Sequence, residues 1–99
     1  MNVENKNLAE SNSPEIKKFI KEHSYFWWWV PEGKKEKLSI DSIVESTLNY
    51  GDSKDIKILF DLIGYQKTKE VFLKQISSKR NNYTKRTLNF FKLYFSKYA

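Results

Sequence analysis

Two glycines, Gly51 and Gly64, divide the middle of the chain into segments of helical length. Before Gly51, apolar residues recur from Ile40 to Leu48 at the three- and four-residue spacing of a helix that buries one face. Asp52 follows directly and can cap a second helix, whose apolar face continues until Gly64 stops it. The sequence therefore predicts two helices that meet at a tight corner between Gly51 and Asp52.

The N-terminal part of the chain changes character at Pro14. Residues 1–13 hold only two sizeable apolar groups among Asn, Ser and Glu, so they cannot bury enough surface to stay ordered alone. Ser13 fits the N-cap and Pro14 the first turn of a short helix that reaches about Glu22. We therefore predict a disordered head over residues 1–13, followed by a helix.

The C-terminal third contains the signals for two more helices. One begins near Gln66 or Thr68 and fades at Ser77. After a basic, polar loop at residues 79–82, Thr84 can cap the last helix. The apolar face predicted for this last helix consists of Leu88, Phe91, Phe95 and Tyr98, widened by Phe90 and Tyr94.

An aromatic run from Tyr25 to Val30 interrupts the helical pattern. If the run is extended, alternate side chains point to opposite faces, and one set of rings remains exposed for a partner to cover. If it is twisted and irregular, most rings lie in the core with only indole N–H groups near water. Because tryptophan often anchors interfaces, the predicted partner-binding residues are Trp27, Trp28 and Trp29, of which one is expected to be exposed.

The fold class that these signals predict is all-α. Sustained alternation of apolar and polar residues, which is typical of a half-buried strand, is absent outside the aromatic run. A chain of 99 residues suits one domain with one core. We expect a compact bundle of about five short helices in a single domain over residues 14–99, with an irregular or extended tryptophan-rich segment.

The net charge is distributed unevenly along the chain. The whole chain has 18 Lys and Arg residues against 12 Asp and Glu residues, a net charge of +6. Residues 1–64 carry nine lysines and eleven acids, a net −2, whereas residues 65–99 carry nine basic residues and only Glu70, a net +8. This excess favours an acidic partner, either a nucleic-acid backbone or an acidic protein surface.

The basic residues of the C-terminal third form a second candidate binding set. Two helices joined at Gly64 have the spacing of a helix-turn-helix, although such corners are common in helical bundles. Contact with phosphates is easier to support than base reading, and a solvated cationic face is an equally good explanation. The candidate residues for binding nucleic acid or an acidic partner are Lys67, Lys69, Lys74, Lys79, Arg80, Lys85 and Arg86.

The residues needed for common catalytic sites are missing from the sequence. There is no Cys, one His, no Gly-rich phosphate loop and no HExxH motif, and the acids are dispersed. His23 beside Glu22 at a helix end is predicted to cap carbonyl groups or to pack against aromatic rings. We expect no enzyme, no cofactor and no metal site, and a small enzyme becomes possible only if a carboxylate converges on His23.

Composition also predicts where the protein acts. Without cysteine there is no disulfide framework, and the basic-then-apolar leader of a secreted protein is not seen. The apolar run from Tyr25 to Pro31 is far shorter than the ~20 residues that cross a bilayer. We therefore expect a cytoplasmic protein without a membrane segment and without an evident small-molecule substrate.

Three stretches carry a resemblance to a known family, namely YFWWWVP at 25–31, ESTLNYGD at 45–52 and TKRTLNFF at 84–91. Their order resembles a small family of uncharacterised bacterial helical proteins with an FWD-like aromatic start, an L-x-Y-G-D helix junction and a closing R-T-L-N-F-W helix. The resemblance covers roughly residues 25–94. The chain has Trp28 where the family has an acid and Phe91 where the family has tryptophan.

The resemblance implies packed short helices and an antitoxin-like role beside nucleotidyltransferase-type toxins of abortive-infection systems. We therefore expect a protein that neutralises a cognate toxin, with the tryptophan-rich segment as an apolar anchor and the basic C-terminal third as an electrostatic guide to an acidic cleft. The alternative is a helix-turn-helix-like transcriptional regulator that binds nucleic acid. The two roles can coexist in one antitoxin.

Overall fold

The structure is a computed structural model that describes residues 12–78 and 81–97. Within these ranges all regular elements are helical, which confirms the all-α prediction. In chain order they are α2 (Pro14–Glu22), η2 (Ser24–Trp27, a 3-10 helix), α3 (Glu32–Lys35), α4 (Ile40–Tyr50), α5 (Ser53–Ile63), α6 (Tyr65–Ser77) and α7 (Lys85–Lys97).

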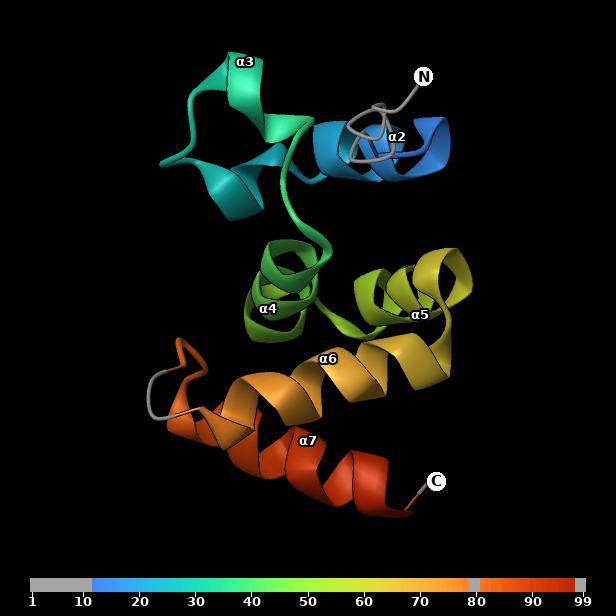
Figure 1. Cartoon of the computed structure of the whole chain (residues 1–99), viewed down its shortest axis with the longest axis vertical. Helices are drawn as coiled ribbons and strands as arrows, with labels where there is room; N and C mark the ends of the chain where they lie inside the picture. Colours follow the sequence, from blue (N-terminus) through green and yellow to red (C-terminus); the bar gives the residue numbers. More distant parts are fainter. Residues whose placement is uncertain (1–11, 79–80, 98–99) are drawn as a thin grey trace, which may run out of the picture.

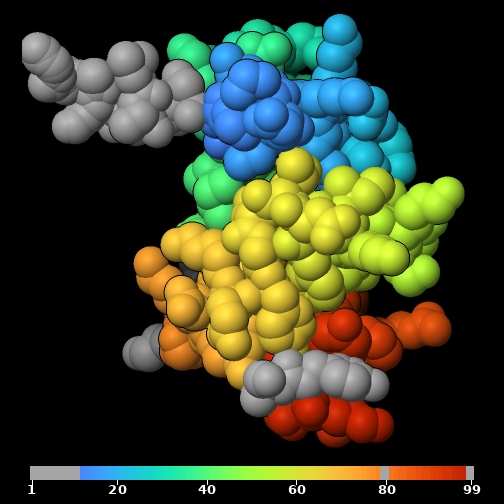
Figure 2. Space-filling view, turned by 90° about the vertical axis from the view of Figure 1, so that its right-hand side faces the viewer, coloured from blue at the N-terminus to red at the C-terminus, as the bar shows by residue number. Residues whose placement is uncertain are grey.

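Figure 1 shows the helices stacked along the longest axis of the molecule, which measures 42 Å against 27 Å in the other two directions. The elements α2, η2 and α3 form one end, α4 and α5 lie in the middle, and α7 forms the other end. Helix α6 crosses between the middle pair and α7 and contacts both α4 and α5. The space-filling view, turned by 90°, agrees that the first and last helices lie at opposite ends (Figure 2).

The five helices predicted from the sequence are present, and two short elements are added within the described residues. The aromatic run does not form an extended strand, because it begins as the 3-10 helix η2. The charged stretch after Pro31, for which the sequence predicts no helix, contains α3, in which Lys35 is buried and its Nζ donates to Oε2 of Glu32 at 2.8 Å. Both added elements are about one turn long, which is too short to show a helical period.

The predicted disordered head falls mostly on residues 1–11, which lie outside the described residues. Asn12 and Ser13 are placed and do not belong to such a head. The side-chain amide of Asn12 donates to the carbonyl oxygens of Glu36 at 2.9 Å and Leu38 at 3.0 Å. Ser13 caps α2, as predicted.

Side-chain caps start α2, α4, α5 and α7 where the sequence predicted them, whereas α6 begins at Tyr65 without one. The carboxylate of Asp52 accepts from the amide of Asp55 at 2.9 Å, and the Asp55 carboxylate accepts in return from the amide of Asp52 at 3.1 Å. The first of these bonds lowers the pKa of Asp52 below its ordinary value. The hydroxyls of Ser39 and Thr84 cap α4 and α7 in the same way. These bonds satisfy amide groups that have no partner within their own helix.

Two glycines at the corners are required for different reasons. A Cβ atom at Gly51 would lie 2.7 Å from the carbonyl oxygen of Thr47 and 2.9 Å from Cβ of Asp55. Gly51 is therefore needed because two backbone segments approach closely there. At Gly64 the space is open, but φ is +93°, a conformation that side chains disfavour.

Aromatic rings attach the last helix to the bundle. The ring of Phe72 in α6 lies 5.3 Å from that of Phe95 in α7 and 5.1 Å from that of Tyr83, which precedes α7. Leu59 of α5 and Val44 of α4 are buried in the same core. Pairs of rings at these distances stabilise the fold beyond the area that they bury.

No helix among the described residues has both the length and the apolar character needed to cross a membrane.

Candidate protein-binding surface

The aromatic run divides into buried and exposed rings at η2. A 3-10 helix has three residues per turn, so Tyr25 and Trp28 lie on the same side. Both point outward, with exposed fractions of 64% and 78%, and Trp29 follows at 52%. Phe26 and Trp27 are buried. The run therefore neither alternates strictly nor buries most of its rings.

Trp27 has no exposed surface and belongs to the core, so the prediction that it contacts a partner is wrong for this fold. Its indole Nε1 is buried and has no hydrogen-bond partner among the described residues. The prediction that one tryptophan of the three is exposed is also wrong, because both Trp28 and Trp29 are. Phe26, which packs edge-on against Trp27 at 5.4 Å, shares its burial.

His23 holds the start of the aromatic run against two helices. Its Nδ1 lies 2.9 Å from the carbonyl oxygen of Phe19, and its Nε2 lies 3.0 Å from Oδ1 of Asp55. The imidazole also stacks on the ring of Phe19 with the ring centres 4.1 Å apart. This agrees with the prediction that His23 caps a carbonyl and packs against aromatic rings. Because Asp55 also belongs to the cap of α5, the contact fixes η2 relative to that helix.

Tyr50, at the end of α4, extends the exposed rings beyond the run. It is 59% exposed, and its ring lies 6.4 Å from that of Phe26. A hollow of about 270 Å³ is lined by Tyr25, Phe26, Trp28 and Tyr50. We call the four exposed residues Tyr25, Trp28, Trp29 and Tyr50 the aromatic surface. Large exposed rings beside a hollow are typical of protein-binding sites.

The basic residues predicted on α6 are not brought together on one face. Lys67 and Lys74 are seven residues apart and share an exposed face, on which Glu70 lies between them. Lys69 is about 200° around the helix from Lys67 and is half-buried. The central position of α6, between α4 and α5 on one side and α7 on the other, also differs from that of a protruding recognition helix (Figure 1).

Two of the remaining predicted basic residues lie at the start of α7. Lys85 and Arg86 occupy its first two positions, and both are exposed. Lys79 and Arg80 lie outside the described residues. Along the described part of α7 every charged residue is basic, since Lys92 and Lys97 follow and no acid occurs.

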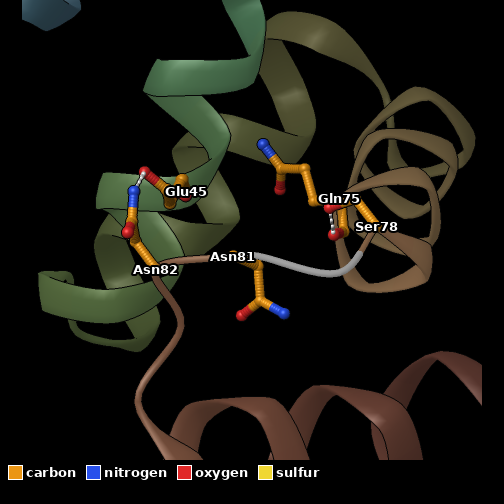
Figure 3. Close-up of a pocket in the computed structure, with 5 residues that line it drawn as sticks. All are labelled: Glu45, Gln75, Ser78, Asn81 and Asn82. Atoms are coloured by element: carbon orange, nitrogen blue, oxygen red, sulfur yellow. Dashed lines mark hydrogen bonds between the residues drawn. The ribbon is translucent and has the colours of Figure 1, made fainter.

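A polar hollow of about 330 Å³ lies between α4, the end of α6 and the segment before α7. Figure 3 shows its lining residues Glu45, Gln75, Ser78, Asn81 and Asn82, with Asn81 pointing away from Glu45 and Gln75. Nδ2 of Asn82 donates to Oε1 of Glu45 at 3.3 Å, and Ser78 donates to the carbonyl oxygen of Gln75 at 2.8 Å (Figure 3). The hydrogen bond from Asn82 to Glu45 holds the segment before α7 to α4, so the lining residues of this hollow have a structural role.

Tyr83, which precedes α7, is hydrogen-bonded to one of the residues that line this hollow. Its hydroxyl donates to Oε1 of Gln75, while Nε2 of Gln75 donates to the carbonyl oxygen of Asp41 at 2.9 Å. Burial of the phenol, together with the carboxylates of Glu45 and Asp41, raises the pKa of Tyr83 well above its ordinary value. The hydroxyl therefore remains a hydrogen-bond donor at neutral pH and holds the start of α7 to α6.

One carboxylate does converge on the single histidine, which is the condition set for an enzyme. However, both ring nitrogens of His23 already lie within hydrogen-bond distance of protein oxygens, Nδ1 of the Phe19 carbonyl and Nε2 of the Asp55 carboxyl group. His23 and Asp55 are both largely shielded, with side chains 10% and 15% exposed, and neither lines a hollow described above. Among the described residues no group of three or more His, Cys, Asp or Glu side chains could hold a metal ion.

Comparison of the chain with models of protein families, with curated proteins and with solved structures finds no match.

Sequence reasoning missed Tyr25 and Tyr50 as members of the exposed set. Neither residue carried a usable signal. Tyr50 lies seven residues after the buried Ile43, which places it at the edge of the apolar stripe of α4. The exposure of Tyr25 depends on the 3-10 geometry of η2.

Proposed function

We propose that the chain is a protein-binding domain without catalytic activity, and that its partner covers the aromatic surface. The observation that supports this most is the gathering of four rings, each more than half exposed, of which three line one hollow and the fourth, Trp29, packs against Trp28. Water contact with so many large apolar groups is unfavourable, and their burial by a partner would stabilise a complex. The rings are held by a rigid base, because Phe26 and Trp27 beneath them belong to the core.

The partner that we propose is a toxin of the nucleotidyltransferase type, which the chain would neutralise as an antitoxin in the cytoplasm. The support for this partner is the resemblance of residues 25–31, 45–52 and 84–91 to the antitoxin-like family. These stretches contain Trp28, Trp29 and Tyr50 of the aromatic surface. The same stretches supply architecture as well, because Gly51 and Asp52 form the corner between α4 and α5.

The test is co-purification with the product of the adjacent gene, followed by calorimetric titration of the two purified proteins. The double variant Trp28→Ala/Trp29→Ala should weaken binding at least about 30-fold, the effect of an interface hot spot of about 2 kcal/mol. Ile58→Ala on α5 is the matched control, because Ile58 is also exposed but lies outside the aromatic surface. Unchanged binding by a folded double variant would show that the rings are not the contact.

Nucleic-acid binding is a distinct outcome of the same experiment. Duplex DNA of mixed sequence should leave the amide resonances of Trp28 and Trp29 unchanged, because exposed apolar rings do not match a phosphate backbone. A complex with DNA whose affinity falls steeply with salt and is abolished by Trp28→Ala/Trp29→Ala would instead favour the regulator.

A further inference from the structure

Helix α7 carries apolar residues on the side that faces away from the core. Leu93 is 72% exposed and Phe90 is 58% exposed. Leu93 is two residues from both Phe91 and Phe95, so it lies about 200° around the helix from these core residues. The prediction that Phe90 widens the buried face is therefore wrong, and the helix is apolar on two sides. A helix of this kind usually has a second neighbour.

The surface is hollowed on both sides of Phe90. One hollow, of about 500 Å³, is lined by Phe90 together with Leu93 and Tyr94. The other, of about 410 Å³, also includes Arg86 and Gly51. A protruding ring between two hollows allows the side chains of a second protein to fit on either side of it.

The second hollow lies between α7 and the end of α4. Asn49 of α4 holds the segment before α7, because its Nδ2 donates to the carbonyl oxygen of Asn82 at 3.0 Å and its Oδ1 accepts from the amide of Thr84 at 3.2 Å. Asn49 and Gly51 both line this hollow, whereas Tyr50, between them in the chain, lines the hollow of the aromatic surface. The end of α4 therefore contributes residues to both hollows.

The charged residues that α7 itself carries beside Phe90 and Leu93 are all basic. Arg86 is seven residues before Leu93 and so lies on the same side of α7, about 10 Å away along the helix. Lys85 and Lys92, which are also seven residues apart, are exposed and lie along the adjacent side of α7. A second copy of the chain in the same place would bring like charges together, and a nucleic acid would leave the apolar side chains without a match.

We infer that the outer side of α7 is a second part of the partner's binding site, and that it receives an acidic segment of a protein whose apolar side chains are flanked by carboxylates. The apolar side chains enter the hollows beside Phe90, and the carboxylates face Arg86 and Lys92. This inference rests on the proposed function for the identity of the partner, but the chemistry of the segment follows from α7 alone.

The experiment is selection of peptides from a random 16-residue display library on the full chain, with affinities then measured on synthetic peptides. The selected peptides should combine Asp or Glu with apolar residues and should shift the amide resonances of Phe90 and Leu93. Leu93→Lys and Arg86→Glu should each weaken these peptides about tenfold. Lys67→Glu, which changes the net charge as much as Arg86→Glu does but lies on α6, should change affinity less than about twofold.

Other results would overturn the inference. Selection of basic or uncharged peptides, equal weakening by Lys67→Glu and Arg86→Glu, or binding that Leu93→Lys leaves intact each excludes an acidic, apolar segment on α7. Leu93→Lys also distinguishes a nucleic-acid partner from a protein partner. The added cation should strengthen the binding of duplex DNA and weaken the binding of the selected peptides. Peptides whose affinity falls with Trp28→Ala but not with Arg86→Glu would contradict the role of α7. They would leave the proposed function intact.

Discussion

The aromatic surface and the outer side of α7 both leave large apolar groups in water, but they do so by different means. In the aromatic run, direct neighbours in the sequence differ in burial, since Trp27 is fully buried and Trp28 is the most exposed large ring among the described residues. In α7 the exposure is regular, because Leu93 and the core residue Phe91 lie on opposite sides of one helix. An irregular segment thus exposes rings through its local geometry, whereas a regular helix exposes them through an excess of apolar residues.

The two surfaces also differ in charge. No residue of the aromatic surface is charged at neutral pH, whereas α7 presents only cations. Uncharged rings contribute to affinity chiefly through the area that they bury. Cations beside an apolar centre contribute mainly to orientation and to the rate of association. The difference assigns affinity to the first surface and guidance to the second. The following variants test how each surface is supported by the fold.

The largest effect is expected at Trp27, which supports the aromatic surface from beneath. Trp27→Ala should lower the free energy of unfolding by about 3–5 kcal/mol, because it removes a fully buried ring and leaves a cavity. Urea titration followed by circular dichroism measures this loss. A Trp27→Ala variant as stable as the parent would show that Trp27 is not part of the buried core beneath the exposed rings.

A smaller effect is expected at Gly51, which lines the hollow beside Phe90 and directly follows Tyr50 of the aromatic surface. Gly51→Ala should destabilise the fold by about 1–3 kcal/mol, because the new Cβ would overlap the Thr47 carbonyl oxygen. Gly33→Ala is the matched control, since nothing lies within 4 Å of its Cβ position and alanine favours the helix α3. Thermal unfolding of both variants checks the difference. Equal unfolding midpoints for the two variants would show that the corner between α4 and α5 can move to accommodate the added methyl group.

High pH should loosen the α7 end of the molecule through Tyr83. The pKa of its phenol is higher in the fold than in the unfolded chain, so the stabilisation is complete below pH 10 and is lost as the pH rises above it. The loss of this one proton changes the free energy of unfolding by at most about 1.4 kcal/mol per pH unit. Tyr83→Phe should remove this part of the slope between pH 10 and 11 in denaturant titrations. An unchanged slope would contradict the assignment.

The smallest effects are expected at the exposed members of both surfaces. Trp28→Ala and Leu93→Ala should each change the free energy of unfolding by less than about 0.5 kcal/mol, as is usual for surface substitutions. Thermal denaturation of the two variants side by side measures this. A loss above 2 kcal/mol for either one would show that it packs into the fold and is not available to a partner.

The parts of the fold that the sequence predicts well are those set by local chemistry. The reciprocal bonds of Asp52 and Asp55 need only residues three apart, and so does the Thr84 cap. The stripes of α4 and α5 follow from the 3.6-residue period, and Gly64 ends α5 as predicted.

The parts that it does not predict depend on contacts between distant segments. His23 and Asp55 are 32 residues apart, and nothing in the sequence indicates that they touch. Gly51 was interpreted as an ordinary helix end, whereas its small size is needed for a close approach to Thr47 and Asp55. For the candidate site, composition indicates the aromatic run, but the distinction between buried Trp27 and its exposed neighbours requires the 3-10 turn.

The division of the three consecutive indoles has a practical consequence for spectroscopy. Trp28 and Trp29 lie in water and should emit at long wavelength with ready quenching by iodide, whereas Trp27 should emit at shorter wavelength and escape the quencher. The quenchable fraction of the emission therefore follows occupancy of the aromatic surface, and the protected fraction follows the integrity of the fold. The chain thus carries two independent optical reporters within three residues, without any added dye.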